Sequence, residues 1–209
     1  MKKIYYLLLG LIIALSTQTN AQAIKQESII TYPNTVISSP YQNINNLIGN
    51  FNYTIRGYNG IKYKSDACGN SAEESRRVIY NQCGKQVVLK DLIITGGYLT
   101  GVDKGAGYCD SSDSSEVVFD NVEITGNVCQ KGAVAFDGNL QIDKAIIYDN
   151  KTSSGEQSNV YIAEDKKIKI TKDISTSKIG ITTEKVPLNA RDSVEFTTGY
   201  GYSTLNTVL

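Results

Sequence analysis

Three carboxylates near the middle of the chain form a candidate site for a divalent cation. Asp110, Asp113 and Glu116 lie close together in a stretch that is otherwise rich in serine. Carboxylate oxygens are the hard ligands that Ca²⁺ prefers, which makes this stretch a calcium candidate. It lacks the D-x-D-x-D-G order of a calcium loop, and Ser-Asp runs usually form solvated turns, so a turn is the favoured interpretation. We therefore expect no catalytic metal and no cofactor.

Six further charged residues fall at positions that would face outward from a sheet: Lys90, Asp91, Asp120, Glu123, Asp143 and Lys144. Strands stacked about 5 Å apart would bring Asp120 close to Asp143 and Lys90. Such a patch can bind a sugar or an ion. A solvated sheet face is the simpler interpretation.

The absence of histidine limits the chemistry of the chain further. Without it there is no Ser-His-Asp or Cys-His machinery and no imidazole ligand for a metal. Arginine, which a lyase acting on acidic sugars would use, occurs only outside the repeats described next. We therefore expect a non-enzymatic protein with no catalytic residues.

An eleven-residue pattern that occurs three times would position these side chains. The copies read V-V-L-K-D-L-I-I-T-G-G from Val87, V-V-F-D-N-V-E-I-T-G-N from Val117 and L-Q-I-D-K-A-I-I-Y-D-N from Leu140. Positions one, three, six and eight are apolar in every copy, which predicts two short alternating strands joined by a polar two-residue step. The expected core residues are Val87, Leu89, Leu92, Ile94, Val117, Phe119, Val122, Ile124, Leu140, Ile142, Ala145 and Ile147.

A second pattern recurs at equal intervals, as K-G-A-G-Y-C-D from Lys104, K-G-A-V-A-F-D from Lys131 and S-N-V-Y-I-A-E from Ser158. Two patterns in a constant order at nearly one period predict a repeat architecture. The period is too short for a strand-helix-strand unit and suits one turn of a parallel β-helix. Asn127 and Asn150 both stand at position eleven of the first pattern, where asparagines can stack in a ladder.

The second copies of the two patterns, taken together, resemble the repeats of a known family. Ile124-Thr-Gly-Asn127 followed by Gly132-Ala-Val134 resembles the F-x-x-N and G-G-A-(I/L/V) repeats of polymorphic outer-membrane proteins and related adhesin-type β-helix proteins. Isoleucine replaces the family's phenylalanine, and Lys131 replaces its first glycine. The resemblance covers about residues 86 to 165. It implies a right-handed parallel β-helix at a bacterial surface and says little about activity.

Residues 1–23 have the organisation of a signal peptide. Lys2 and Lys3 precede an apolar run from Ile4 to Leu15, and Ala21-Gln22-Ala23 fits an A-x-A cleavage site. The run is too short to span a bilayer comfortably, which favours cleavage near Ala23 over an anchor. We expect an exported protein that is extracellular, at the cell surface or associated with the outer membrane, and whose mature chain has no transmembrane segment.

The charge of the chain argues against a nucleic-acid partner. It carries 21 basic and 21 acidic residues, and the expected leader holds two of the lysines, so the mature chain has a formal charge of −2. There is no basic stripe. The expected partner is an unidentified surface protein or a glycan.

The four cysteines are candidates for disulfides in an exported protein, since oxidising compartments favour them. They are Cys68, Cys83, Cys109 and Cys129. Three connectivities are open, and we expect Cys68–Cys83 and Cys109–Cys129, with free buried thiols as the alternative.

The expected organisation is all-β: a signal peptide over residues 1–23, an N-terminal cap or linker over 24–60 with possible strands at 28–32 and 53–58, a right-handed parallel β-helix of four to five rungs over 61–173 and a C-terminal cap over 174–209. The expected function is adhesin-like binding of a host, matrix or glycan partner, on fold-level analogy. Two alternatives stay open. One is a calcium-dependent enzyme of the polysaccharide-lyase type, and the other is a structural fragment of a larger surface-protein system.

Overall fold

The computed structural model describes residues 29–32, 46–47, 52–57, 62–67, 76–189 and 191–199. These residues form strands, bridges and turns, with no helix among them, which confirms the all-β class. It follows that no helix within the described ranges is long and apolar enough to cross a bilayer. The expected leader over residues 1–23 and Cys68 lie outside the described residues.

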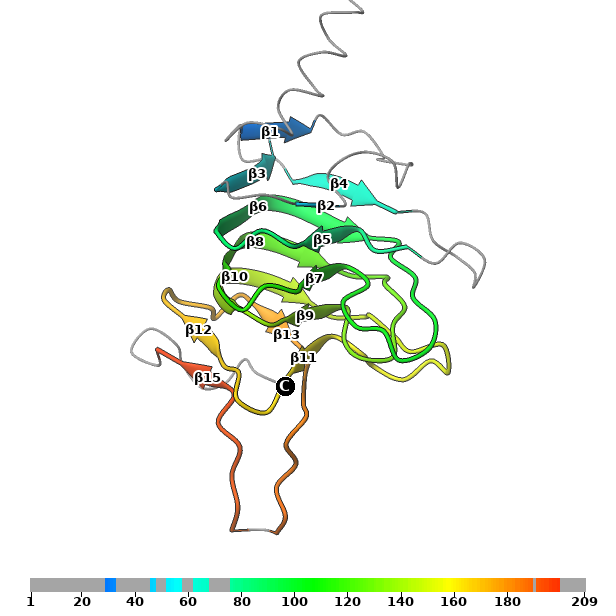
Figure 1. Ribbon diagram of the computed structural model, residues 1–209, viewed down its shortest axis with the longest axis vertical. Coiled ribbons are helices and arrows are strands. Elements are labelled where there is room, and N and C mark those ends of the chain that lie inside the picture. The colour runs from blue at the N-terminus through cyan, green and yellow to red at the C-terminus, as the bar shows by residue number, and fades with distance from the viewer. Residues whose placement is uncertain are drawn as a thin grey trace, which may run out of the picture.

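The strands form two sheets, and all their pairings are parallel (Figure 1). Sheet A contains, in spatial order, β1 (Ile29–Tyr32), β3 (Tyr53–Gly57), β6 (Gln86–Thr95), β8 (Glu116–Ile124), β10 (Asn139–Ile147), β12 (Ile168–Ile170) and β15 (Thr197–Thr198), with β4 (Tyr63–Asp66) beside β6 and β13 (Lys178–Ile179) beside β10. Sheet B contains β14 (Ile181–Thr183), β11 (Val160–Ile162), β9 (Val134–Phe136), β7 (Tyr108–Asp110), β5 (Ile79–Asn81) and β2 (Asn46–Leu47).

The three repeat copies form the centre of sheet A as β6, β8 and β10. Val87 pairs with Val117, which pairs with Leu140, and matching positions are paired again at the ends of the strands. Each of the twelve expected core residues is at most 2% exposed. Alternation along each strand places these side chains between the sheets, where Phe119 meets Tyr108 of sheet B edge to face at 5.3 Å.

The polar step bends each strand without dividing it into the two strands that were expected. Asp91 and Asn121 take left-handed backbone angles, with φ of 52° and 59°, and the Asn121 side chain donates a 2.7 Å hydrogen bond to Asp91. In β10 the register shifts at the step, so that Lys144 pairs with Asp120. Each strand continues through the step because it pairs with the neighbouring strands both before and after the step.

The second pattern forms β7, β9 and β11 of sheet B. Lys104 bridges Lys131, so the paired residues there are as far apart in sequence as the pattern predicts. Tyr108 pairs with Val134, so four residues later the sequence separation of the paired residues is shorter by one. Gly107 accounts for the difference, because it and Tyr108 both donate their backbone N–H to the Ala133 carbonyl. A Cβ on Gly107 would lie 2.8 Å from Ile124, so glycine fits this extra position.

Sheet A extends beyond the three clear copies in both directions. The possible strands at 28–32 and 53–58 occur as β1 and β3, so strands on both sides of the expected limit at residue 61 share one sheet. Further along, β12 and β13 pair with the two halves of β10, and Ile179 pairs with Ile147. Residues 171–177 therefore form an insertion at the step.

An arm between β14 and β15 projects from the end of the two sheets, drawn in orange and red in Figure 1. Val186 and Leu188 lie on this arm and are 67% and 91% exposed.

Candidate functional site

The three carboxylates that formed the calcium candidate do not converge. Asp110 is fully buried at the end of β7, and its carboxylate accepts hydrogen bonds from Asn81 Nδ2 at 3.2 Å, from the Ser115 hydroxyl and from two backbone N–H groups. The Asp113 side chain is 90% exposed and lies 3.7 Å from the Lys166 ammonium. Glu116 accepts a hydrogen bond from Gln86 on the outer face of β8.

These carboxylates therefore form no calcium site together, and the turn interpretation fits the structure better. No group of three or more metal-ligating side chains occurs within the ranges that the structure describes. The physical reason is alternation, because residues close in sequence point to opposite faces of a sheet or into separate turns. Burial raises the pKa of Asp110, and the hydrogen bonds it accepts from Ser115, Ser112 and Gly138 oppose that rise.

Tyr108 lies beside this buried carboxylate. Its hydroxyl is the one buried side-chain polar atom without a hydrogen bond of good geometry among the described residues. Burial raises the pKa of Tyr108 well above its usual value, the charge of Asp110 adds to the rise, and the nearby Asn81 side chain partly offsets it. Both groups are closed off from solvent, so neither can reach a ligand.

Two of the cysteines occur as buried thiols. Cys109 and Cys129 are both free, so the expected bond between them is not formed. The Cys129 thiol donates to the Asp103 carbonyl at 3.0 Å, and burial raises the pKa of both thiols. Cys83 is also buried, and the expected Cys68–Cys83 bond involves a residue outside the described ranges.

The six charged residues expected to face outward pair mainly with other charged side chains of the protein, but Asp91 is buried at the step of β6 and does not face solvent. Lys90 contacts Asp120 at 2.5 Å, as the register predicts. Asp143 is buried and instead pairs with Lys172 at 2.7 Å, because the step of β10 is shifted. Burial alone would raise the pKa of Asp143, but the hydrogen bonds from Lys172, Thr171 and Gln141 together lower it. These pairs occupy most of the charges that a ligand would need, whereas Lys144 is exposed and its side chain makes no ion pair within the described ranges.

The two asparagines at position eleven form the expected ladder, and Asn159 of the second pattern extends it. Asn127 accepts from the Gly97 N–H at 2.8 Å and donates to Asn150 Oδ1 at 2.8 Å, and Asn150 donates to Asn159 Oδ1 at 3.0 Å. All three asparagines are buried. Their amides are used within the protein, which confirms their structural role.

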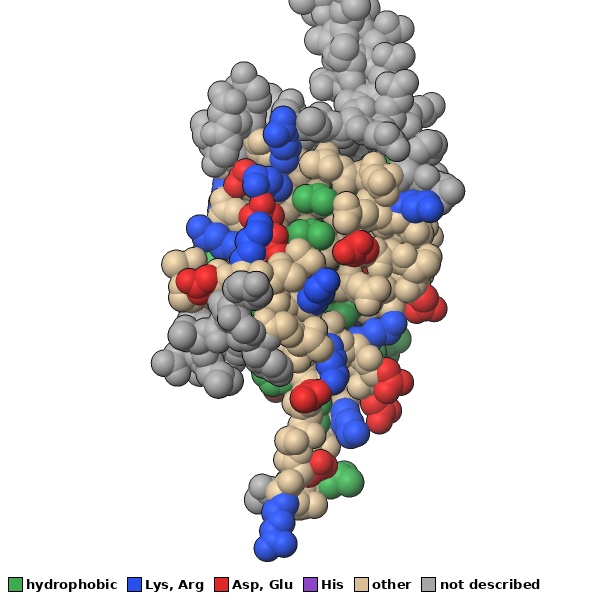
Figure 2. Space-filling model, turned by 90° about the vertical axis from the view of Figure 1, so that its left-hand side faces the viewer, with side chains coloured by type: hydrophobic (Ala, Val, Ile, Leu, Met, Phe, Trp, Pro, Cys, Tyr) green, Lys and Arg blue, Asp and Glu red, His purple; other side chains and the backbone are tan. Residues whose placement is uncertain are grey.

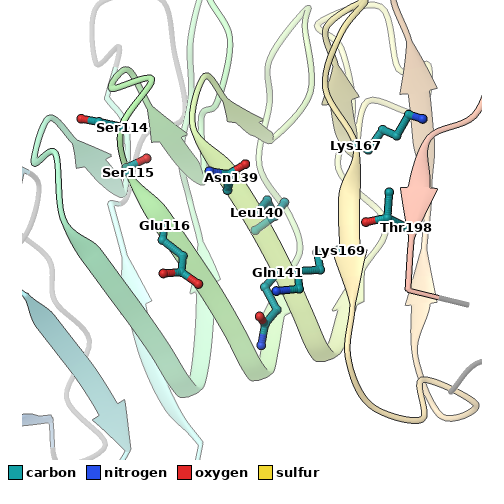
Figure 3. A pocket seen from close by; sticks show the side chains of 9 residues that line it. All are labelled: Ser114, Ser115, Glu116, Asn139, Leu140, Gln141, Lys167, Lys169 and Thr198. Atoms are coloured by element: carbon teal, nitrogen blue, oxygen red, sulfur yellow. The ribbon is translucent and has the colours of Figure 1, made fainter. Parts of the chain in front are cut away.

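A groove on the outer face of sheet A is the best candidate for a binding site (Figure 3). It has a volume of about 390 Å³ and crosses β8, β10, β12 and β15. Besides Ser114, Ser115 and Leu140, its lining has six polar or charged side chains: Glu116, Asn139, Gln141, Lys167, Lys169 and Thr198. Register explains their alignment, since Gln141 pairs with Lys169 and Lys169 with Thr198.

Half of these six side chains have no partner in the described part of the chain. Glu116 bonds to Gln86, Gln141 donates to Asp143 at 2.9 Å, and Lys167 pairs with Glu195. Asn139, Lys169 and Thr198 are exposed, and their side chains make no hydrogen bond or ion pair there. An amide, an ammonium and a hydroxyl are thus available on neighbouring strands.

The surrounding surface has mixed charge. Figure 2 shows Lys and Arg side chains interspersed with Asp and Glu over the face turned to the viewer, above the projecting arm. A mixed surface of this kind does not favour a uniformly charged polymer such as a nucleic acid.

The sequence patterns did not single out the groove. Its residues occupy outward positions of the repeat or of the later strands, where Val88 and Val118 stand in the earlier copies. The change from valine to Gln141 and Lys169 along one row was the available indication. Comparison of the chain with protein-family models, curated proteins and solved structures found no match.

Proposed function

We propose that the protein is an exported, non-enzymatic surface or secreted protein that binds an extended glycan along the groove of sheet A. We further propose that the two parallel sheets are faces of a right-handed parallel β-helix. Successive copies of the two sequence patterns pair side by side and in parallel in both sheets, which supports that architecture. The handedness rests on the resemblance to outer-membrane repeat proteins.

The observation that carries the binding proposal is a set of three side chains, Asn139, Lys169 and Thr198, that lack a partner among the described residues. Neighbouring strands are spaced by about 4.8 Å, so the four strands of the groove offer polar groups over about 14 Å. Sugars present closely spaced hydroxyls that both donate and accept, which amides and hydroxyls match. The groove volume also falls within the range of small-ligand sites, about 300–1,000 Å³.

Binding fits this groove better than catalysis. Glycoside hydrolysis needs a pair of carboxyl groups flanking the scissile bond, and the described lining of the groove offers Glu116 alone. Calcium-dependent elimination needs a carboxylate cluster, and Asp110, Asp113 and Glu116 are held apart. The groove instead presents donors and acceptors in a row along a rigid sheet.

The test is a binding panel with the purified protein. Neutral and acidic polysaccharides are incubated with and without Ca²⁺, and co-sedimentation and unsaturated product are followed together. We expect binding without turnover, reduced at least fivefold when Asn139 and Gln141 are both replaced by alanine. The matched control is Asn189→Ala on the projecting arm, which should bind as the parent does.

Three outcomes would count against the proposal. Calcium-dependent product would replace it with the lyase alternative. Equal losses in the double variant and in Asn189→Ala would place binding outside the groove. An absence of binding to every glycan would favour a protein partner or a structural role.

The export proposal has its own measurement. N-terminal sequencing of the protein isolated from its native cells should find Ile24 as the first residue, since Ala21-Gln22-Ala23 fits the cleavage site. A protein that retains Met1 inside the cell would contradict export.

A further inference from the structure

We propose that the glycan held in this groove is acidic and that one of its carboxylates binds the Lys169 ammonium. This inference rests on the proposed function and names the ligand class for the same groove. It starts from a contrast among the five lysines between residues 166 and 178.

Four of these lysines already have partners. Lys166 lies near Asp113, Lys167 pairs with Glu195, Lys172 pairs with Asp143, and the Lys178 ammonium lies 3.3 Å from the centre of the Tyr148 ring. Lys169 has neither an anion nor an aromatic ring beside it in the described part of the chain. It is also exposed and lines the groove.

The neighbours of Lys169 suit a carboxylate. Figure 3 shows the Lys169 and Gln141 side chains next to each other, with Thr198 on the strand beyond. The Thr198 hydroxyl and the Lys169 ammonium are donors on adjacent strands, which are spaced by about 4.8 Å. A carboxylate between them gains one charge-assisted and one neutral hydrogen bond. Gln141 Oε1 remains as an acceptor for a sugar hydroxyl, because Gln141 uses its Nε2 on Asp143.

The opposite end of the groove disfavours a second carboxylate. Glu116 lies on β8, two strands from β12, which is a separation of about 10 Å. A carboxylate there would be repelled, whereas a neutral sugar could donate a hydroxyl hydrogen bond to Glu116. The groove thus has a cationic end for an acidic sugar and an anionic end for a neutral one.

The experiment compares two probes with one backbone: a neutral oligosaccharide that carries one uronic acid, and the methyl ester of the same oligosaccharide, in which that carboxylate is masked. Binding is measured by calorimetry at physiological ionic strength. We expect the parent protein to bind the acid about tenfold more tightly than the ester, which is the effect of one charge-assisted hydrogen bond. Lys169→Gln should lose that preference and still bind the ester within about twofold of the parent.

Three variants sharpen the test. Lys144→Gln removes a lysine from the exposed outer face of the same sheet but outside the groove, so its preference should equal that of the parent. Lys169→Arg should retain the preference, because guanidinium also binds carboxylates. Glu116→Gln should also retain the preference, because the single carboxylate of the probe lies about 10 Å away, at the Lys169 end of the groove.

Two results would overturn the inference while the proposed function stands. One is equal binding of acid and ester by the parent protein, and the other is an equal loss of acid binding in Lys169→Gln and Lys144→Gln. If neither probe binds and no neutral glycan binds, the proposed function itself fails and the inference falls with it.

Discussion

Asn127 donates its side-chain amide to Asn150 Oδ1 at 2.8 Å, although the two asparagines belong to different copies of the repeat. The same Asn127 side chain accepts the backbone N–H of Gly97 from the preceding copy. Each asparagine therefore links one copy to the next. The same kind of contact recurs because β6, β8 and β10, which precede these residues in the three copies, pair matching positions of the repeat.

Replacing Asn127 with alanine should lower the free energy of unfolding by about 3 kcal/mol. The substitution leaves the buried Gly97 N–H without its acceptor, which costs about 1–3 kcal/mol, and it removes the side-chain hydrogen bond to Asn150 Oδ1, which keeps only the backbone N–H of residue 127 as a donor. Denaturant unfolding followed by circular dichroism measures the change. Asn139→Ala, at an exposed position with no side-chain partner among the described residues, should change stability by less than about 0.5 kcal/mol.

Phe119→Ala should cost about 3–5 kcal/mol, because it removes a fully buried ring and leaves a cavity against Tyr108. Val118→Ala is the matched control, since its side chain lies on the outer face of the same strand and is half-buried. Thermal and denaturant unfolding of the two variants should give clearly different stabilities. Similar losses would contradict the inward placement of the first and third repeat positions.

Replacing Gly132 and Gly101 with alanine distinguishes the cost of backbone strain from the cost of steric crowding. Their φ angles are 66° and 72°, so alanine at either position is strained by about 1–2 kcal/mol. A Cβ on Gly132 would also lie 2.6 Å from the Tyr161 backbone nitrogen, whereas one on Gly101 would meet nothing within 4 Å. Gly132→Ala should therefore be the more destabilised variant in the same unfolding assay. Equal losses would mean that β9 and β11 separate easily at this point.

The raised pKa of Asp110 gives the fold a pH dependence of known sign. An unfolded chain ionises this carboxyl near its usual pKa of about 3.9, and the folded protein resists ionisation up to a higher pH. This contribution to stability is complete below about pH 4 and is lost as the pH rises through the raised pKa.

Measuring the free energy of unfolding from pH 3 to pH 8 tests this dependence. Asp110→Asn should show a flatter loss of stability with rising pH than the parent, even though it is less stable throughout. Asp113→Asn, at a 90% exposed carboxyl, should follow the parent curve. A parent-like slope in Asp110→Asn would assign the pH dependence to other groups.

Cys109 and Cys129 should resist a water-soluble alkylating reagent in the folded protein. Both thiols are buried, and burial raises the pKa of each, so little reactive thiolate forms. Mass spectrometry after alkylation should find them unmodified under native conditions and modified in denaturant without a reducing agent. Resistance in denaturant as well would show that these cysteines form disulfides.

The repeat pattern alone determined much of the architecture. Apolar residues at positions one, three, six and eight predicted which side chains of β6, β8 and β10 are buried. Asparagine at position eleven predicted the ladder. Both predictions succeeded because alternation and period are local properties, and each copy carries them independently of the others.

Tertiary structure alone decided which polar groups are available to a ligand. Asp110 and Asp113 are close in sequence, yet one is buried among four donors and the other is exposed. Lys167 directly precedes β12 and Lys169 lies on it, yet only Lys167 meets Glu195. The partner of each charge comes from a distant segment of the chain, and insertions such as residues 171–177 set which residue arrives there. Spacing within a short stretch of sequence does not contain that information.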